Sequence, residues 1–203
     1  MQKTIFLILF TTNFLLLGNI SFAQSEIPED ITTGGKAKCI LKGNVPIKKG
    51  IADGNRLVIL RSGDFANGSI LFQRTIIEEG FSLDINTLAL FGSIPDLNAF
   101  LAGRILDFQN SESDFSIRVV KQEDQSVTEV TNLLDDGTKG NLIGKVKLTS
   151  SRNNLASGSG FFIIEKTIRK VSSNNNEIPT SDNGKVSIKC NFKNIPLAIK
   201  DLE

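Results

Sequence analysis

Polar and apolar residues alternate without a break in Lys185-Val186-Ser187-Ile188-Lys189-Cys190-Asn191-Phe192-Lys193. A period of two is typical of a β-strand with one buried face and one face in water. Near the other end of the chain, Lys36-Ala37-Lys38-Cys39-Ile40-Leu41-Lys42 alternates in the same phase. We expect these two segments to be neighbouring strands that close the fold.

The only two cysteines of the chain, Cys39 and Cys190, fall on the apolar phase of these strands. In an exported protein two cysteines more often pair than stay free, so we predict a Cys39–Cys190 disulfide. Such a bond requires Cα atoms within about 7 Å of each other. The alternative is a pair of buried thiols that pack as small apolar side chains.

The first residues have the pattern of a secretory signal peptide. Lys3 supplies a positive start, an apolar run extends from Ile5 to Leu17, and Ser21-Phe22-Ala23 offers the small residues that a signal peptidase reads. We therefore predict a signal peptide over residues 1–23, cleaved near Ala23, and a secreted, periplasmic or cell-surface location. The alternative is an uncleaved membrane anchor.

The rest of the chain has room for one domain. The 203-residue chain leaves about 180 residues after the signal peptide, enough for one domain with its own core. We predict a flexible leader over residues 24–34, which are acidic and poor in apolar side chains, and a single β domain over residues 35–203. No later run approaches the length of a transmembrane helix, so we predict no transmembrane segment in the mature chain.

Composition limits the classes of partner and of chemistry. The chain has 23 basic and 22 acidic residues and a net charge of +1, so the total charge gives no reason to expect nucleic acid or an anionic membrane as partner. The expected kind of partner is another envelope or surface protein. Histidine is absent, which removes the usual general base and the commonest transition-metal ligand. The 14 phenylalanines, with no tryptophan or tyrosine, are typical of core filling.

The remaining segments also favour β-structure. Short apolar or alternating runs are separated by turn signals such as Asp135-Asp136-Gly137. Because strands and helices do not alternate, the pattern predicts an all-β fold: a single antiparallel β-sandwich or flattened barrel of about nine or ten strands. The segments predicted as strands are 35–45, 56–61, 69–77, 81–86, 115–121, 126–134, 142–149, 161–166 and 185–193.

The segment from residue 93 to residue 105 departs from the strand pattern. Ser93 is a candidate helix cap, and four apolar residues after it share one helical face. We predict a short helix here that plugs one end of the fold, with a strand from Phe100 to Phe108 as the alternative. The four apolar residues are Leu97, Phe100, Leu101 and Ile105.

The region before the last strand is polar. Residues 172–183 contain three consecutive asparagines and are predicted to form a long loop. The last strand is predicted to end at Ile195-Pro196-Leu197, because proline cannot donate to a ladder.

Pairs of carboxylates are the strongest candidates for chemistry. Two acids can hydrolyse a glycosidic bond or bind calcium. Every pair lies in a predicted turn, where Asp and Glu serve solubility and local hydrogen bonds, and no serine has a histidine to activate it. We therefore predict no catalytic residue, no cofactor and no metal site. The pairs are Glu78-Glu79, Glu123-Asp124 and Asp135-Asp136.

Lysines recur on the solvent-facing side of each of the two predicted strands that carry a cysteine. If the strands are neighbours, these lysines join into a basic patch that receives an acidic ligand. The structural interpretation is a solvated face, with lysine discouraging strand-to-strand aggregation, and the sequence favours it. The lysines of the predicted patch are Lys36, Lys38, Lys42, Lys185, Lys189 and Lys193.

Three segments near the end share a pattern of a Gly-x-Val-x-Leu-Thr strand, a Ser-Gly-x-Phe-x-Phe-like strand and a final Gly-x-Val strand. They are Gly144-Lys145-Val146-Lys147-Leu148-Thr149, Gly158-Ser159-Gly160-Phe161-Phe162-Ile163 and Asn183-Gly184-Lys185-Val186-Ser187-Ile188. In this pattern the chain resembles small, largely uncharacterised exported bacterial β-sandwich proteins. It departs from them in carrying Cys190 and the long asparagine loop. The resemblance implies an exported β-sandwich and transfers no functional residue.

Taken together, these features favour a binding or structural role. The signal peptide, the all-β pattern and the missing catalytic residues predict an exported, non-catalytic domain of the bacterial surface or envelope. A second hypothesis is a barrel that carries a small apolar ligand, with phenylalanines lining a cavity. A third is a hydrolase with two carboxylates converging in one cleft.

Overall fold

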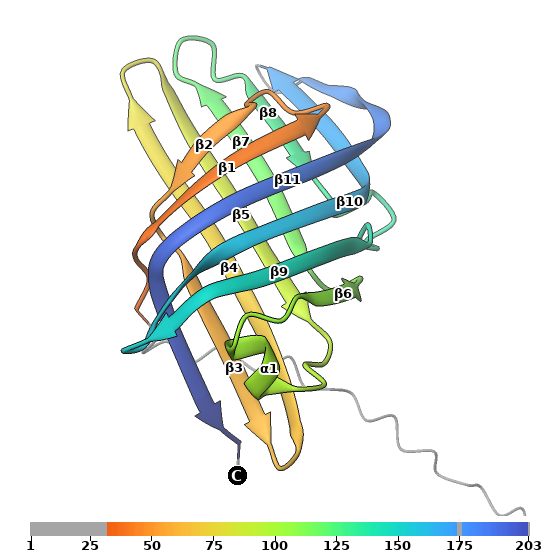
Figure 1. Cartoon of the computed structure of the whole chain (residues 1–203). Coiled ribbons are helices and arrows are strands. Elements are labelled where there is room, and N and C mark those ends of the chain that lie inside the picture. Colours follow the sequence, from red (N-terminus) through yellow and green to blue (C-terminus); the bar gives the residue numbers. More distant parts are fainter. Residues whose placement is uncertain (1–31, 174–175, 203) are drawn as a thin grey trace, which may run out of the picture.

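The computed structural model describes residues 32–173 and 176–202. Within them the chain forms eleven strands and one short helix (Figure 1). The predicted signal peptide, residues 1–23, and residues 24–31 of the predicted leader lie outside the described part. The elements are β1 (Lys36–Gly43), β2 (Lys49–Ala52), β3 (Arg56–Ser62), β4 (Phe65–Glu78), β5 (Phe81–Phe91), α1 (Leu97–Leu101), β6 (Leu106–Asn110), β7 (Asp114–Lys121), β8 (Val127–Thr131), β9 (Leu142–Arg152), β10 (Leu155–Ser173) and β11 (Asn176–Asp201).

The strands belong to one mixed sheet that is folded into two layers. The front layer in Figure 1 has the order β2-β1-β11-β10-β9-β6, and the rear layer has the order β3-β4-β5-β7-β8. The strands of the two layers cross at a steep angle, as in orthogonally packed sheets (Figure 1). Apolar side chains from the two inner faces form a single core.

Two long strands, β10 and β11, belong to both layers. The first part of β10 pairs with β9, and its part from Ile168 to Ser172 pairs with β8. β11 first pairs with β1 and β10, bends at Asn194, where φ is 53°, and then pairs in parallel with β3 from Leu197 to Asp201. The neighbours β11, β3, β4, β5, β7, β8 and β10 therefore form a ring that closes on β11.

The predicted all-β fold with one short helix is confirmed. The strand count is eleven in the described residues, because β2 and β6, of four and five residues, are too short to show a period in the sequence. The prediction of a purely antiparallel sheet is wrong at one place, where β3 and the end of β11 run parallel.

Two predictions about the last strand are wrong. Residues 176–183, predicted as part of a polar loop, belong to β11. Pro196 does not end the strand, since β11 continues to Asp201. Proline lacks only its own donor, and the next N–H, of Leu197, donates to the carbonyl oxygen of Asn154 at 2.8 Å.

A chain of phenylalanine rings joins the two layers inside the core. Neighbouring ring centroids are between 4.8 and 6.3 Å apart, in tilted or edge-on arrangements. The rings come from both layers and from α1, so they fill the core, as the composition predicts. In order, they are Phe192, Phe72, Phe162, Phe108, Phe91 and Phe100.

The helix α1 covers one end of the space between the layers (Figure 1). Its cap is Asp96 rather than the predicted Ser93: Asp96 Oδ1 accepts from the N–H of Ala99 at 2.9 Å. Phe100 anchors the helix in the core, whereas Ile105 lies beyond its end and is 52% exposed. In the part of the chain that the structure describes, no helix is long and apolar enough to cross a membrane.

Candidate functional site

The two lysine-rich strands, β1 and β11, are neighbours. They pair antiparallel, with Lys36 opposite Lys193 and Cys39 opposite Cys190. Cys39 and Cys190 form a disulfide with Cα atoms 4.1 Å apart, so the predicted bond is confirmed. The first and last strands of the domain therefore close on each other, as the sequence predicts.

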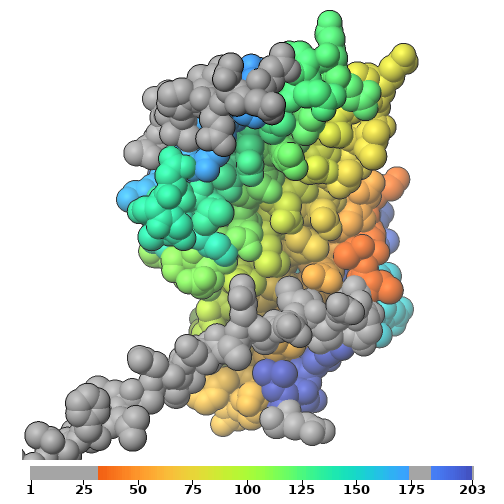
Figure 2. Space-filling view, turned by 180° about the vertical axis from the view of Figure 1, so that it is seen from behind, coloured from red at the N-terminus to blue at the C-terminus, as the bar shows by residue number. Residues whose placement is uncertain are grey.

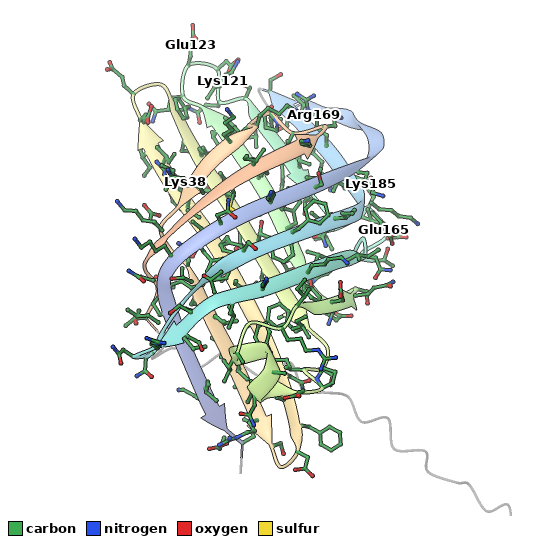
Figure 3. All side chains as sticks on the ribbon, in the orientation of Figure 1. Lys38, Lys121, Glu123, Glu165, Arg169 and Lys185 are labelled. Atoms are coloured by element: carbon green, nitrogen blue, oxygen red, sulfur yellow. A yellow bond between two sulfur atoms is a disulfide. The ribbon has the colours of Figure 1, made fainter. Side chains whose placement is uncertain are left out.

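All six lysines of the predicted patch lie on the outer face of the front layer. Strand alternation buries the residues between them, such as Ala37 and Val186, and leaves the lysines exposed. The pairing of β1 with β2, and of β10 with β9, adds three exposed lysines to the same face. We call the surface formed by these nine residues the basic face, and Figure 3 labels two of them, Lys38 and Lys185. They are Lys36, Lys38, Lys42, Lys49, Lys145, Lys147, Lys185, Lys189 and Lys193.

Two rows of side chains cross the basic face, and in the first of them lysines alternate with apolar residues. Each row follows directly opposed residues from strand to strand. The first row crosses all six strands of the layer, and the second crosses five of them. The first row reads Lys49, Ile40, Lys189, Phe161, Lys145 and Asp107, and the second reads Ile51, Lys38, Asn191, Ser159 and Lys147.

Positive charge is concentrated on the basic face of the described structure. Only two carboxylates, Asp107 and Glu165, share the basic face in the described structure, and Asp107 forms an ion pair with Lys145 at 2.8 Å. Nine lysines and two carboxylates contribute +7, whereas the other side chains that the structure describes, 13 basic and 14 acidic, contribute only −1. The total charge thus hides a concentrated positive field on one face.

Positive and negative side chains are balanced on the outer face of the rear layer, which is on the side seen in Figure 2. Asp84, Arg118, Glu129 and Lys170 stand directly opposite one another on β5, β7, β8 and β10. Their signs alternate, so neighbouring charges offset each other at cross-strand distance. The surplus of lysine is therefore specific to the front layer.

Protection of sheet edges explains only some of the lysines. Lysine on an exposed edge strand discourages pairing with another chain. Eight of the nine lysines lie on β1, β9 and β11, and each of these strands has a hydrogen-bonded neighbour on both sides. Lys49 stands on β2, the strand at the end of the order, and Lys42 and Lys147 lie beyond the residues that pair with β2 and β6. Edge protection therefore leaves unexplained the lysines with a paired strand on both sides, such as Lys38 and Lys189.

The strands that carry the basic face are held by a disulfide and by a hydrogen bond from the rear layer. The disulfide joins β1 to β11 directly beneath it, with Cys39 8% and Cys190 0% exposed. The short strand β2 is held from the rear layer, because Arg74 of β4 donates from Nη1 to the carbonyl oxygen of Ile51 at 2.6 Å. The backbone positions of the lysines are thus set by covalent and hydrogen-bonded links between strands.

The carboxylate pairs lie in or beside turns, as predicted, and two of their members bond to their own turn. Asp136 Oδ1 accepts from the N–H and the hydroxyl of Thr138 at 2.9 and 2.6 Å, and these bonds lower the pKa of Asp136. Hydrogen bonds from Ser126 lower the pKa of Asp124 in the same way. Among the described residues, no group of histidine, cysteine, aspartate and glutamate side chains is arranged to hold a metal ion.

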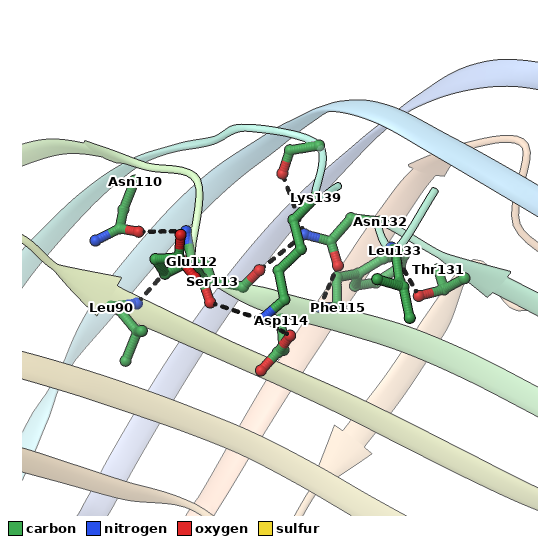
Figure 4. A network of polar contacts seen from close by, with 11 residues as sticks. Leu90, Asn110, Glu112, Ser113, Asp114, Phe115, Thr131, Asn132, Leu133 and Lys139 are labelled. Atoms are coloured by element: carbon green, nitrogen blue, oxygen red, sulfur yellow. Dashed lines mark hydrogen bonds and ion pairs between the residues drawn. The ribbon is translucent and has the colours of Figure 1, made fainter. Parts of the chain in front are cut away.

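A buried polar cluster links the loop before β7 to the loop after β8 (Figure 4). Asn132 is 1% exposed, and its Nδ2 donates to the carbonyl oxygens of Ser113 and Gly140 at 2.8 and 3.1 Å. Its Oδ1 accepts from the N–H of Phe115 at 3.0 Å. Because every polar atom of the Asn132 side chain has a partner, the cluster fixes the loops and offers nothing to a ligand.

The interior beneath the basic face is filled. The cavity between β1, β2 and the rear layer, lined by Phe72 and Ile85 among others, has a volume of about 10 Å³, roughly the space of one water molecule. A surface groove of about 180 Å³ lies between α1 and the start of β6, lined by Phe100 and Ile105 among others. The hypothesis of an apolar-ligand carrier requires a hollow interior, and neither space supplies one.

Three lysines of the basic face are absent from the sequence-based patch: Lys49, Lys145 and Lys147. Lys145 and Lys147 alternate with Gly144 and Val146 in the same two-residue period, so that signal was present in the sequence. What the sequence lacked was the strand order, which places β9 two strands from β11. Lys49 had no such signal, because β2 is too short.

The resemblance of the last third of the chain to exported bacterial β-sandwich proteins stays a prediction. Its segments lie on β9, β10 and β11, three successive strands of the front layer. Comparison of the chain with protein-family models, curated proteins and solved structures gives no match.

Proposed function

We propose that the protein is an exported, non-enzymatic binding domain of the cell envelope, and that the basic face attaches it to an anionic partner. The observation that carries the proposal is the concentration of positive charge: nine lysines and two carboxylates share one face, while the other described side chains are nearly balanced. A field of one sign raises the local concentration of a partner of opposite charge and speeds its encounter.

Export rests on the predicted signal peptide over residues 1–23. The Cys39–Cys190 disulfide is compatible with this location, because disulfides persist in oxidising compartments and are rare in the cytosol. The sequence favours an envelope or surface protein as partner. The basic face widens that class to any envelope surface that displays phosphate or carboxylate groups.

A role without catalysis is supported by the side chains around the lysines. No serine of the basic face is hydrogen-bonded to a lysine amine in the described structure, as a Ser–Lys dyad would require. Ser157 instead accepts at Oγ from the N–H of Asn194 at 3.0 Å. The chain contains no histidine to serve as general base.

Retention of the purified protein on immobilised polyglutamate, eluted with a salt gradient, tests the proposal. The variant K38Q/K147Q/K189Q removes three exposed charges from the basic face. It should elute at clearly lower salt than the wild type, because screened attraction weakens with each lost charge. The matched control R104Q/R118Q/K121Q removes three exposed charges elsewhere and should elute with the wild type.

Two results would contradict the proposal. Equal shifts of both variants would mean that retention follows net charge rather than the basic face. A wild type that is not retained at low salt would mean that the face has no affinity for a polyanion.

A further inference from the structure

Three apolar side chains are exposed inside the basic face. Ile40 and Ile51 are each 45% exposed, and Phe161 is 40% exposed. Ile40 and Phe161 lie among the lysines, since Ile40 stands between Lys49 and Lys189, and Lys189 in turn stands between Ile40 and Phe161. Ile51 lies opposite Lys38 on β2, the strand at the end of the layer. Single exposed apolar residues are ordinary. Three of them within an array of lysines indicate a partner whose anionic and apolar parts lie close together.

The arrangement fits an extended surface rather than a small molecule. Ile51 lies on β2 and Phe161 on β10, three strand spacings apart in the order of the layer, which is about 15 Å. The space beneath them is the cavity of about 10 Å³, so no ligand enters between the layers. A partner must therefore contact the side chains from outside, over several strands at once.

The cations of the basic face are lysines only. Arginine presents a planar fork that reads carboxylate or phosphate in fixed geometry, whereas lysine is a hydrated point charge on a flexible stem. Arginine, tyrosine and tryptophan also dominate the strong contacts of protein interfaces, and the chain has no tyrosine or tryptophan. This composition fits a fluid layer of anionic headgroups better than the fixed surface of a protein.

We propose that the basic face binds the surface of an anionic lipid bilayer, an inference that rests on the function proposed above. The lysines lie at the level of the headgroups, and Ile40, Ile51 and Phe161 enter the boundary between headgroups and acyl chains. The long lysine stems keep each charge in the headgroup layer while the shorter apolar side chains insert.

Co-sedimentation with lipid vesicles tests this inference. The wild type should bind vesicles of phosphatidylcholine and phosphatidylglycerol, and binding should weaken with salt and be absent for phosphatidylcholine alone. K38Q/K147Q/K189Q should bind the anionic vesicles more weakly by on the order of 100-fold, the combined effect of three lysines near a charged surface.

The apolar residues are tested with I40T/I51T/F161T, in which threonine preserves the preference for β-structure. This variant should lose about tenfold or more in vesicle affinity while its retention on polyglutamate is unchanged. The matched control is F65T/I77T/L133T, which removes three apolar side chains outside the face that are 75, 76 and 48% exposed. It should bind vesicles as the wild type does.

The outcomes separate this inference from the proposed function. Retention on polyglutamate without any preference for anionic vesicles would overturn the bilayer and leave an anionic polymer or protein as partner. Wild-type vesicle binding by I40T/I51T/F161T would overturn the insertion of apolar side chains. Failure to bind either polyglutamate or vesicles would reject both proposals together.

Discussion

Glycine and phenylalanine are matched across the strands of the front layer. Phe108 of β6 and Phe162 of β10 both stand opposite Gly144 of β9, and a methyl group added to Gly144 would overlap the ring of Phe108. At Gly160 an added Cβ would lie 2.5 Å from the ring of Phe162. Because glycine has no side chain, these two positions leave space for the phenylalanine rings that join the two layers.

The substitution Gly144→Ala should therefore destabilise the protein by about 1–3 kcal/mol, the usual cost of adding a methyl group to a filled core. Denaturant unfolding measures the difference. The control is Gly92→Ala, because an added Cβ at Gly92 meets nothing within 4 Å. If G144A and G92A unfold at the same denaturant concentration, the close contact between ring and glycine does not exist in solution.

The Cys39–Cys190 disulfide holds together β1 and β11, two strands of the basic face. It links positions 151 residues apart in the chain, so its loss should lower the free energy of unfolding by about 2–5 kcal/mol. The variant C39A/C190A should unfold at lower denaturant, and the wild type should match it once a reductant is added. An unfolding midpoint that reductant leaves unchanged would show that the cysteines are not bonded.

Individual strands differ in how far the sequence predicts them. Alternation alone identifies β1, β9 and the central part of β11, because each has one wet and one buried face over seven or more residues. It fails for β2 and β6, where four and five residues give too few repeats. It also fails beyond Pro196, because the rule that proline ends a strand does not anticipate a strand that changes partners at the proline.

The parallel contact between β3 and the end of β11 is closed by an ion pair. Arg61 Nη2 donates to Asp201 Oδ2 at 2.9 Å. The hydrogen bond from Arg61 and then its charge lower the pKa of Asp201. A carboxyl group with a lowered folded-state pKa stabilises the fold above its unfolded pKa, about 3.9 for aspartate, and loses that effect as pH falls through the folded value.

Asp201→Asn should accordingly lower the denaturant midpoint at about pH 6 and have progressively less effect below about pH 3.9. The effect should be small and should shrink further in high salt, because both side chains are exposed. Urea unfolding of the wild type and D201N across this range measures it. A difference between the two proteins that grows as the pH falls would contradict the assigned role of the pair.

At the scale of the whole molecule, the organising feature is the placement of charge on one layer of a closed sheet. The basic face gathers lysines from β1, β2, β9 and β11, while the rear layer alternates signs. The net charge of +1 does not reveal this face, because it sums over every residue of the chain. Six of the nine lysines of the basic face, those on β1 and β11, follow from the sequence. The rest depends on the strand order.

Binding through the basic face, as proposed, would give the protein a fixed orientation. With the front layer against an anionic surface, the rear layer would face away from it (Figures 1 and 2). The disulfide and the contact of Arg74 with β2 keep the attached layer joined to the rest of the molecule.

The most direct test of the central claim is lysine footprinting. The protein is treated with an amine-acetylating reagent with and without anionic vesicles, and each lysine is quantified by mass spectrometry. We predict that Lys38, Lys147 and Lys189 lose reactivity when vesicles are present, while Lys121 and Lys170, exposed elsewhere on the molecule, keep theirs. Equal protection of all five lysines, or protection of Lys121 and Lys170 alone, would contradict the proposed binding through the basic face.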